Sequence, residues 1–326
     1  MTEGISSPLA AGAAGRRWSA RARDLLGGDQ RRFWIPVFLA PFLVLYGGFT
    51  LWPLLATGLY SLFDWDGIEA LNRFVGLGNY ARAVGDPIFW LAFRNTLLFA
   101  VLNCVIKLPL TLLAAVLLTQ RWLWFKRFFR TVLFLPLILP VAAAGLVFTF
   151  LLNPSNGALD SLLVGSGLLK EPIDLLGHDN TALLTIVLVS VWQIFGQYLI
   201  YWMAALQSVP EDLYEAAAID GAGPWRQMVA ITLPLIRPVA LIITLLALVN
   251  SLHVFGAVVT LTGGGPGQAT YVVSYYIYNE AFRQAPFAYG YASAVALLFG
   301  VLAFLFVFGQ GLLARSAERL RREYGV

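Results

Sequence analysis

The side chains best suited to recognising a ligand lie in otherwise apolar segments. The candidates are Lys107, Gln193, Gln197, Tyr198, Asn250 and His253. Amides, hydroxyls and aromatic faces are the groups that fix polar ligands such as sugars in largely apolar sites. Gln193 and Gln197 are four residues apart and would share one face of a helix. Hydrogen bonding between helices explains each of these residues equally well.

Charged and metal-binding groups are scarce in the same segments. Lys107 has two readings, a counter-charge for an anionic substrate or a structural partner at a helix interface, and the structural reading is favoured. His253 is one of only two histidines and has no second histidine or carboxylate near it in sequence. The single cysteine, Cys104, lies in an apolar run. The sequence therefore predicts neither a metal site nor a catalytic residue.

A short acidic stretch, EDLYEAAAIDGAGPWRQMVAITLPLIRP, occupies residues 211–238. Ser208 and Glu211 have the spacing of a capping box, which predicts a helix from there to about Asp220. Gly221 is a natural stop because glycine adopts the left-handed conformation without strain. Pro224 can open a second short helix. The stretch is therefore expected to form a helical hairpin with a tip of small residues.

The elements around this hairpin are those of a membrane protein. Of the 326 residues, 59% are hydrophobic and only 12% are charged, about half the charged share of a soluble domain. Six runs are long and apolar enough to cross a bilayer, which predicts an all-α polytopic protein with six transmembrane helices. They cover residues 33–63, 89–118, 128–152, 182–206, 233–260 and 289–313.

The distribution of positive charge predicts the orientation. Of the 22 Lys and Arg residues, sixteen lie in the arm of residues 1–32, the tail of residues 314–326 and the two loops on the same side. Four lie in the other three loops, and Arg94 and Lys107 belong to the second span. The positive-inside rule places both termini and the hairpin, residues 207–232, in the cytoplasm. Two outer segments follow: an exposed connection from Asn153 to Asn180 and a short interfacial helix within residues 270–282.

The hairpin resembles the EAA loop of the permease subunits of binding-protein-dependent ABC importers. Glu215, Ala216 and Ala217 are followed at the family's spacing by Gly221 and then by Ile231, Leu233 and Pro234, with Asp220 beside the glycine. The loop precedes the penultimate span, where the family has it. The resemblance implies a type I importer permease fold whose five-helix core covers residues 89–313.

The resemblance also implies how such a chain acts. The first helix of the loop would be a coupling helix that docks into a cytoplasmic ABC ATPase, present in two copies. Their closure on ATP and Mg would turn the spans from inward- to outward-facing. This chain has no G-x-x-x-x-G-K-[ST] loop and is expected to bind no cofactor and to catalyse nothing itself. Further implied partners are a second permease, an extracytoplasmic solute-binding protein and membrane lipid, with no nucleic acid. The location implied is the cytoplasmic membrane of a prokaryote.

A second motif resembles the carbohydrate branch of these permeases. Gly264, Gly265 and Pro266 open the stretch LTGGGPGQATYVVSYYIYNEAF, residues 261–282, and are expected to form an outer gate motif. Maltose-, trehalose- and glycerol-3-phosphate-type subunits share this pattern. The chain lacks the maltose subunit's large extra domain and has six rather than eight spans, which favours the shorter relatives. A sugar is the expected substrate, with a glycerophospho-compound as the alternative.

Two other classes of protein explain the sequence less well. An ion-coupled secondary transporter usually needs carboxylates within the membrane, and spans two to six contain no Asp or Glu. A membrane enzyme needs clustered acid, base or metal groups at one membrane face. Both alternatives leave the EAA-type hairpin unexplained.

Overall fold

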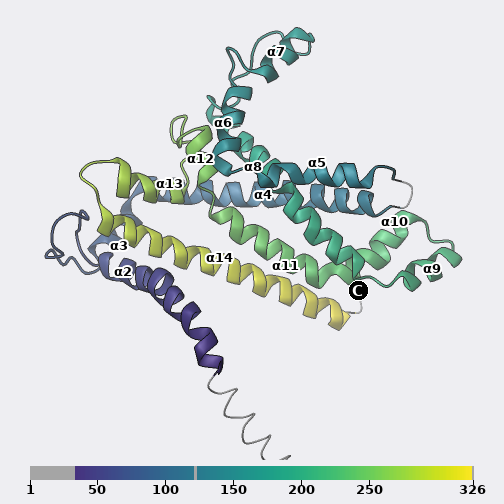
Figure 1. The fold of residues 1–326 in the computed structure, drawn as a ribbon, viewed down its shortest axis with the longest axis horizontal. Helices are drawn as coiled ribbons and strands as arrows, with labels where there is room; N and C mark the ends of the chain where they lie inside the picture. The colour runs from purple at the N-terminus through teal and green to yellow at the C-terminus, as the bar shows by residue number, and fades with distance from the viewer. Residues whose placement is uncertain (1–33, 121–122, 325–326) are drawn as a thin grey trace, which may run out of the picture. The chain divides into compact units, whose positions relative to one another are not determined.

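The computed structural model describes residues 34–120 and 123–324, with side chains described as far as residue 311 (Figure 1). The predicted basic arm, residues 1–32, lies outside the described residues, as do the side chains of the predicted tail. The chain divides into two units, residues 1–59 and 60–326, which are described separately.

The first unit contributes one apolar helix. Residues Trp34–Tyr60 form 27 helical residues, including a π-helical turn, η1 (Gly47–Leu51), and α2 (Trp52–Tyr60). At 1.5 Å per residue this length exceeds the thickness of the hydrocarbon core. Pro53 is accommodated near the start of α2, and the Thr57 hydroxyl donates to its carbonyl oxygen at 2.8 Å. The helix occupies the first predicted span.

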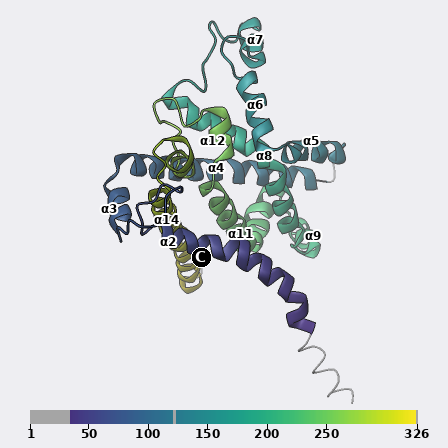
Figure 2. The same cartoon turned by 60° about the vertical axis from the view of Figure 1, so that its left-hand side comes forward.

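The second unit is built on four long helices. They are α4 (Pro87–Thr119), α8 (Asp179–Gln207), α11 (Leu233–Leu252) and α14 (Tyr289–Tyr324). Helix α4 packs against both α8 and α11, and these elements lie beside one another in Figures 1 and 2. Phe89, Tyr198 and Leu252 are buried in the shared core. Many Leu, Val and Phe side chains on the outer faces remain exposed, which is the surface a lipid bilayer covers.

The third predicted span differs from the expectation of one helix over residues 128–152. The chain forms α5 (Lys126–Ile138) and α6 (Val141–Leu151), whose axes are bent by 101°. Pro140 explains the break, because a residue that precedes proline avoids the helical region. Leu139 accordingly has an extended ψ of 131°. The described residues thus contain five helices long and apolar enough to span a membrane, and a sixth span if the bent pair counts as one.

Shorter helices complete the second unit. They are α3 (Gly78–Gly85), α7 (Ala158–Gly165), α12 (Gly256–Leu261), α13 (Val273–Tyr278) and the π-helical η3 (Asn279–Arg283). The predicted exposed connection contains α7, and the predicted interfacial helix is α13 with η3. Helix α6 packs on α12, where the Thr149 hydroxyl donates to Gly145 O at 3.0 Å and Thr260 O at 3.2 Å.

The acidic stretch forms a hairpin at the end of the bundle opposite α13. It consists of α9 (Glu211–Ile219), α10 (Pro224–Gln227) and the π-helical η2 (Met228–Thr232), which leads into α11. Figure 1 shows α9 and α10 projecting beyond the ends of the long helices.

Candidate functional site

The end of α9 has a specific hydrogen-bonded cap. Gly221 has a φ of +77°, in the left-handed region. The Ala222 amide donates to Ala217 O at 2.8 Å and the Gly221 amide donates to Ala218 O at 3.1 Å. These two bonds define a Schellman motif with Gly221 at the position that glycine prefers. The glycine therefore fixes the direction in which the chain leaves α9.

The predicted capping box at the start of α9 is wrong. Pro210 is the N-cap, and no side chain caps the helix. Ser208 instead ends α8, and its hydroxyl donates back to Ala205 O at 2.7 Å. The long apolar helix continues to Gln207, so the serine satisfies that helix's last carbonyls and is not available to α9.

Two hydroxyl groups join the first and last elements of the hairpin, α9 and η2. Tyr214 Oη on α9 lies 2.8 Å from Thr232 Oγ1 on η2, and Thr232 is only 4% exposed. Within the turn, the Gln227 side chain donates to Ala222 O at 2.9 Å. A pocket of about 780 Å³ lies between the hairpin and the ends of α4 and α8, lined in part by Gln120, Gln207 and Tyr214. Movement of α9 is thus tied directly to the start of α11.

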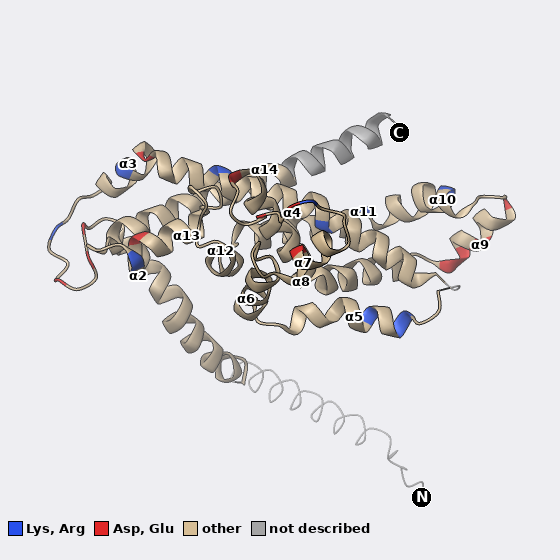
Figure 3. Cartoon of the chain, turned by 90° about the horizontal axis from the view of Figure 1, so that it is seen from above, with Lys and Arg blue, Asp and Glu red and all other residues tan. Residues whose placement is uncertain are grey.

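The tip of the hairpin exposes apolar side chains that the sequence interpretation did not single out. Ile219 is 87% exposed and Trp225 is 80% exposed. Acidic residues lie along α9 and basic Arg226 on α10, as Figure 3 shows. An exposed apolar pair rimmed by charge is the composition of a protein-docking surface.

The motif residues fall into two groups around this tip. The first group lies on α9 and its turn. Its exposed members are Glu215, Ala216, Asp220 and Gly221, whereas Ala217 is half-buried. Ile231 is half-buried in η2, while Leu233 and Pro234 are exposed in the first turn of α11. Pro234 lies inside one continuous helix over Pro224–Leu252, directly after the π-helical turn η2.

A second candidate site is a polar pocket of about 190 Å³ between α4, α8, α11 and α12. Its polar lining includes Asn103, Gln193, Asn250, Ser251 and His253. The Ser251 hydroxyl donates to Asn103 Oδ1 at 3.1 Å. Asn103 Nδ2 has no hydrogen-bond partner among the residues that the structure describes, although Asn103 is only 1% exposed. A buried amide without a partner is costly, which marks Asn103 as a group that a polar ligand in this pocket can satisfy.

The structure brings three of the predicted substrate residues to this pocket and leaves three outside its lining. Gln193, Asn250 and His253 line it. Gln193 is 6% exposed and donates to Leu139 O at 3.2 Å, at the break between α5 and α6. Gln197 does not share this position, because its amide donates to Tyr201 Oη at 2.9 Å.

Lys107 and Tyr198 lie together beside the pocket. Both are 0% exposed, and Lys107 Nζ lies 4.1 Å from the centre of the Tyr198 ring. Lys107 Nζ has no hydrogen-bond partner among the described residues. The Asn250 amide donates to the Tyr198 hydroxyl at 3.2 Å. The predicted helix-interface partner of Lys107 is therefore an aromatic face.

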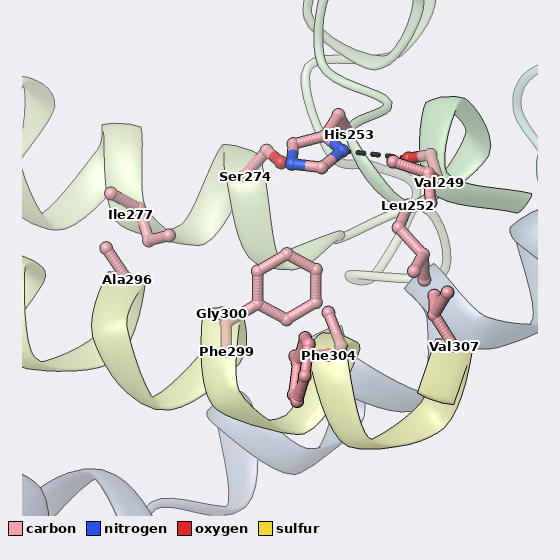
Figure 4. Close-up of a pocket in the computed structure, with 11 residues that line it drawn as sticks. Val249, Leu252, His253, Ser274, Ile277, Ala296, Phe299, Gly300, Phe304 and Val307 are labelled. Atoms are coloured by element: carbon pink, nitrogen blue, oxygen red, sulfur yellow. Dashed lines mark hydrogen bonds between the residues drawn. The ribbon is translucent and has the colours of Figure 1, made fainter. Parts of the chain in front are cut away.

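A third pocket, of about 530 Å³, is largely apolar. It lies between α11, α13 and α14 and is lined by Phe299, Phe304 and Val307 among others (Figure 4). His253 and Ser274 stand along one edge, and His253 Nδ1 lies 2.8 Å from Val249 O. This pocket offers few groups that could recognise a hydroxylated ligand.

The outer motif is a tight turn packed against aromatic rings. Gly264 has a φ of +87°, and a Cβ there would lie 2.7 Å from the Tyr275 ring. Thr270, which is 0% exposed, donates to Gly265 O at 2.6 Å. The Asn95 amide on α4 donates to Gln268 O at 3.1 Å, just beyond Pro266. The turn is thus held in place from α4.

A polar network joins α13 to its neighbours near this turn. The hydroxyls of Tyr276 and Tyr291 both donate to Asp86 Oδ2, at 2.5 and 3.1 Å. Asp86 also caps α4 by accepting from the Ile88 amide at 2.8 Å. The Arg82 guanidinium stacks over the Tyr291 ring at 4.0 Å. Burial raises the pKa of Tyr276, so its hydroxyl keeps its proton and remains a donor.

Metal and covalent chemistry find no support in the described part of the chain. It contains no group of three or more His, Cys, Asp or Glu side chains that could hold a metal ion. The candidate sites in this part of the chain are a projecting hairpin with exposed apolar side chains and a polar pocket between the long helices. The fold defines the class of protein, a polytopic helical membrane protein.

Comparison with known proteins gives the family. Residues 107–319 match the model of the binding-protein-dependent transport system inner membrane component. The chain is 38% identical over 264 residues to the probable ABC transporter permease protein YurN of Bacillus subtilis, covering 80% of this chain and 88% of that protein. It is 34% identical over 275 residues to the lactose transport system permease protein LacF of Rhizobium radiobacter, covering 82% and 91%. It is 31% identical over 271 residues to the sn-glycerol-3-phosphate transport system permease protein UgpA of Agrobacterium fabrum, covering 82% and 90%.

Solved structures show the same fold. A chain of a bacterial ABC transporter involved in the import of the acidic polysaccharide alginate has a TM-score of 0.76 at 25% identity, covering 90% of this chain and 99% of that one. A chain of a bacterial alginate ABC transporter, in complex with a periplasmic protein bound to alginate pentasaccharide, has a TM-score of 0.77 at 22% identity and covers 90% and 98%.

The chain belongs to the family of binding-protein-dependent transport system inner membrane components. The all-α polytopic fold and the importer-permease resemblance are thereby confirmed. It is a multi-pass inner-membrane permease and a non-catalytic subunit of an ABC importer. It works with an ATP-binding partner and a solute-binding partner.

Proposed function

We propose that this chain moves a sugar across the cytoplasmic membrane by alternating access, driven by ATP hydrolysis on its partner. The observation that carries the proposal is the hairpin. Helix α9 ends in a glycine-fixed cap and exposes Ile219, and α10 exposes Trp225. The Tyr214 hydroxyl on α9 contacts Thr232 in η2, which leads into α11. A force applied to α9 therefore reaches a helix that lines the polar pocket.

The hairpin is the coupling loop of this proposal. The exposed surface of Glu215, Ala216, Asp220 and Gly221, with Ile219 beside it, docks into a cleft of the ATPase. Small side chains at this surface allow a close approach, and exposed Ile219 supplies apolar area to bury. Ile231, Leu233 and Pro234 form the connection that carries the movement into α11.

The family to which the chain belongs and the proposed coupling hairpin support a larger assembly. We assign the complex two copies of the ATPase, which hold ATP and Mg, a second related permease, and a solute-binding protein on the outer side. Both termini and the hairpin face the cytoplasm, in accord with the distribution of Lys and Arg.

The substrate pathway runs through the polar pocket. Asn250 is exposed, His253 stands beside it, and the unpartnered Asn103 amide faces the same space. Such groups suit the hydroxyls of a sugar, since each can donate or accept one hydrogen bond. Two relatives are named for sugar transport: the lactose permease protein LacF, and the diacetylchitobiose uptake system permease protein NgcF of Streptomyces coelicolor, which is 32% identical over 298 residues. A sugar fits this lining better than glycerol 3-phosphate, because the described residues that line the pocket include no Lys or Arg.

The outer motif serves as a gate above this pocket. Gly264, Gly265 and Pro266 form a turn held by α4 through Asn95, so a shift of α4 displaces the turn. Closure of this turn separates the pocket from the outer side.

The test is uptake by cells that carry or lack this chain. Labelled lactose, diacetylchitobiose and glycerol 3-phosphate are offered in turn, with and without a deletion of the coding sequence. We expect the deletion to abolish uptake of one of the two sugars and complementation to restore it. Loss of glycerol 3-phosphate uptake alone would refute the sugar assignment. Uptake that persists without ATP but collapses with the ion gradient would refute the ATP-driven mechanism.

A further inference from the structure

A buried cation without a hydrogen bond stands next to the polar pocket. Lys107 is 0% exposed, and its ammonium has no hydrogen-bond partner among the described residues. Removing an ammonium from water is costly unless other interactions replace the lost hydration. The group in the position to do so is the Tyr198 ring, whose centre lies 4.1 Å from Lys107 Nζ.

The ring that Lys107 contacts also holds a side chain that lines the pocket. The Tyr198 hydroxyl accepts a hydrogen bond from Asn250 Nδ2 at 3.2 Å. Asn250 is exposed and lines the pocket, whereas Tyr198 and Lys107 are fully buried and do not. Once the Asn250 nitrogen is held, the amide oxygen has a fixed direction as an acceptor.

Lys107 and Tyr198 lie on the same side of the polar pocket along the axes of α4 and α8. Lys107 follows Asn103 by four residues on α4, and Tyr198 follows Gln193 by five on α8. Four to five residues correspond to about 6 to 7.5 Å along a helix axis. Both residues of the pair are thus displaced in the same direction from the pocket-lining residues of their own helices. They lie toward the end where α4 and α8 meet the hairpin.

We propose that Lys107 is a positioning residue, which holds the Tyr198 ring so that its hydroxyl orients the Asn250 amide toward a sugar hydroxyl. This inference rests on the proposed sugar transport. Lys107 itself does not touch the substrate. Its charge matters because an ammonium binds a ring face, whereas an uncharged chain of similar length only fills space.

The test compares how much sugar is moved for each ATP hydrolysed. The complex is purified with its binding protein, reconstituted in proteoliposomes and supplied with labelled lactose or diacetylchitobiose, whichever the wild type takes up. Lys107→Met removes the charge and keeps the length, Lys107→Arg keeps a cation, and Tyr198→Phe keeps the ring but removes the acceptor. Arg94→Met is the matched control, since Arg94 is an exposed cation on the same helix outside the pocket lining.

Lys107→Met and Tyr198→Phe are each expected to lower sugar moved per ATP on the order of fivefold, the effect of one hydrogen bond. Lys107→Arg and Arg94→Met are expected to stay within about twofold of the wild type. In an Asn250→Ala background, Lys107→Met should add no further loss, because the two residues act through one contact.

Three results would overturn the inference. The first is a normal sugar-to-ATP ratio in Lys107→Met or Tyr198→Phe. The second is a full additional loss when Lys107→Met is combined with Asn250→Ala. The third applies if Lys107→Met does not assemble. The test then rests on Tyr198→Phe, and a normal sugar-to-ATP ratio in that variant would refute the positioning role. Failure of the wild type to take up either sugar would instead refute the proposed substrate class and this inference with it.

Discussion

Replacing Gly221 by valine isolates the conformation of the turn after α9. Gly221 has a φ of +77°, and no atom of the described residues lies within 4 Å of a Cβ built at this position. We therefore expect the cost of the substitution to come mainly from the left-handed backbone. That cost is about 1–2 kcal/mol for an ordinary residue, toward the upper end for a β-branched one.

Such a penalty lowers the equilibrium ratio of the native turn to alternative turn conformations by about 5–30-fold. If α9 must be presented in this orientation to engage the ATPase, ATP hydrolysis stimulated by the loaded binding protein should fall by at least about fivefold. The bundle should still assemble, because the turn is exposed and contributes nothing to the core. The assay is ATP hydrolysis by the purified complex in nanodiscs, normalised to the amount of this chain.

Gly221→Asn is the matched control. Asparagine enters the left-handed region far more readily than valine, so this variant should retain at least half of the wild-type rate. A Gly221→Val variant with wild-type stimulation would refute the argument from φ. Equal damage in both variants would show that side-chain volume at the docking surface matters and that the turn conformation does not.

Three further perturbations have expected outcomes. Tyr214→Phe removes the hydroxyl contact to η2, worth about 1 kcal/mol, and should weaken stimulated ATP hydrolysis while the ATPase still co-purifies; unchanged stimulation would refute the connection between α9 and α11. Asn250→Ala should reduce sugar uptake, whereas Gln197→Ala should not, because only Asn250 lines the pocket; equal effects in the uptake assay would refute the pocket assignment. Asp86→Ala removes the α4 cap and the acceptor of the Tyr276 hydroxyl, so it should lower the free energy of unfolding by about 2–4 kcal/mol and lower the Tm in detergent. Asp86→Asn keeps one acceptor oxygen, and equal Tm values for the two variants would contradict this expectation.

The features that could be predicted from the sequence are those set by local chemistry. Long runs with few charges predict the order and approximate positions of the spans, since a helix that crosses lipid must be predominantly apolar over about 20 residues. The cap at Gly221 and the start of α10 at Pro224 follow from backbone preferences of single residues. These local signals were sufficient to place the hairpin.

Features that depend on tertiary contacts were missed or misassigned. The extended conformation of Leu139 before Pro140 breaks the third span, although prolines elsewhere, such as Pro109 in α4, remain inside their helices. The presence of a proline therefore does not predict whether a helix breaks or continues. At the break after Leu139, the Gln193 amide donates to the Leu139 carbonyl oxygen, which stabilises the interrupted backbone. The same contact explains why Gln193 and Gln197, on one helix face, have different partners.

The remaining differences between the sequence-based predictions and the structure concern which side chains are buried and which are exposed. The sequence shows a lysine in an apolar run, but it does not show that an aromatic ring from another helix covers its ammonium. Likewise, the exposure of Ile219 and Trp225 at the hairpin tip is known only once the hairpin has a structure. Such contacts join residues about 90 positions apart, as Lys107 and Tyr198 do, beyond the reach of local pattern.

The most direct test of the central claim is to identify what the hairpin binds. The chain is tagged, extracted gently from native membranes and analysed by mass spectrometry with its bound proteins, in parallel with a variant carrying Ile219→Asp and Trp225→Asp. We expect an ATPase, a second permease and a solute-binding protein to accompany the wild type. The double variant should lose the ATPase but keep the second permease. A wild type that arrives without an ATPase, or a double variant that keeps it undiminished, would contradict the assignment of the hairpin as the coupling loop.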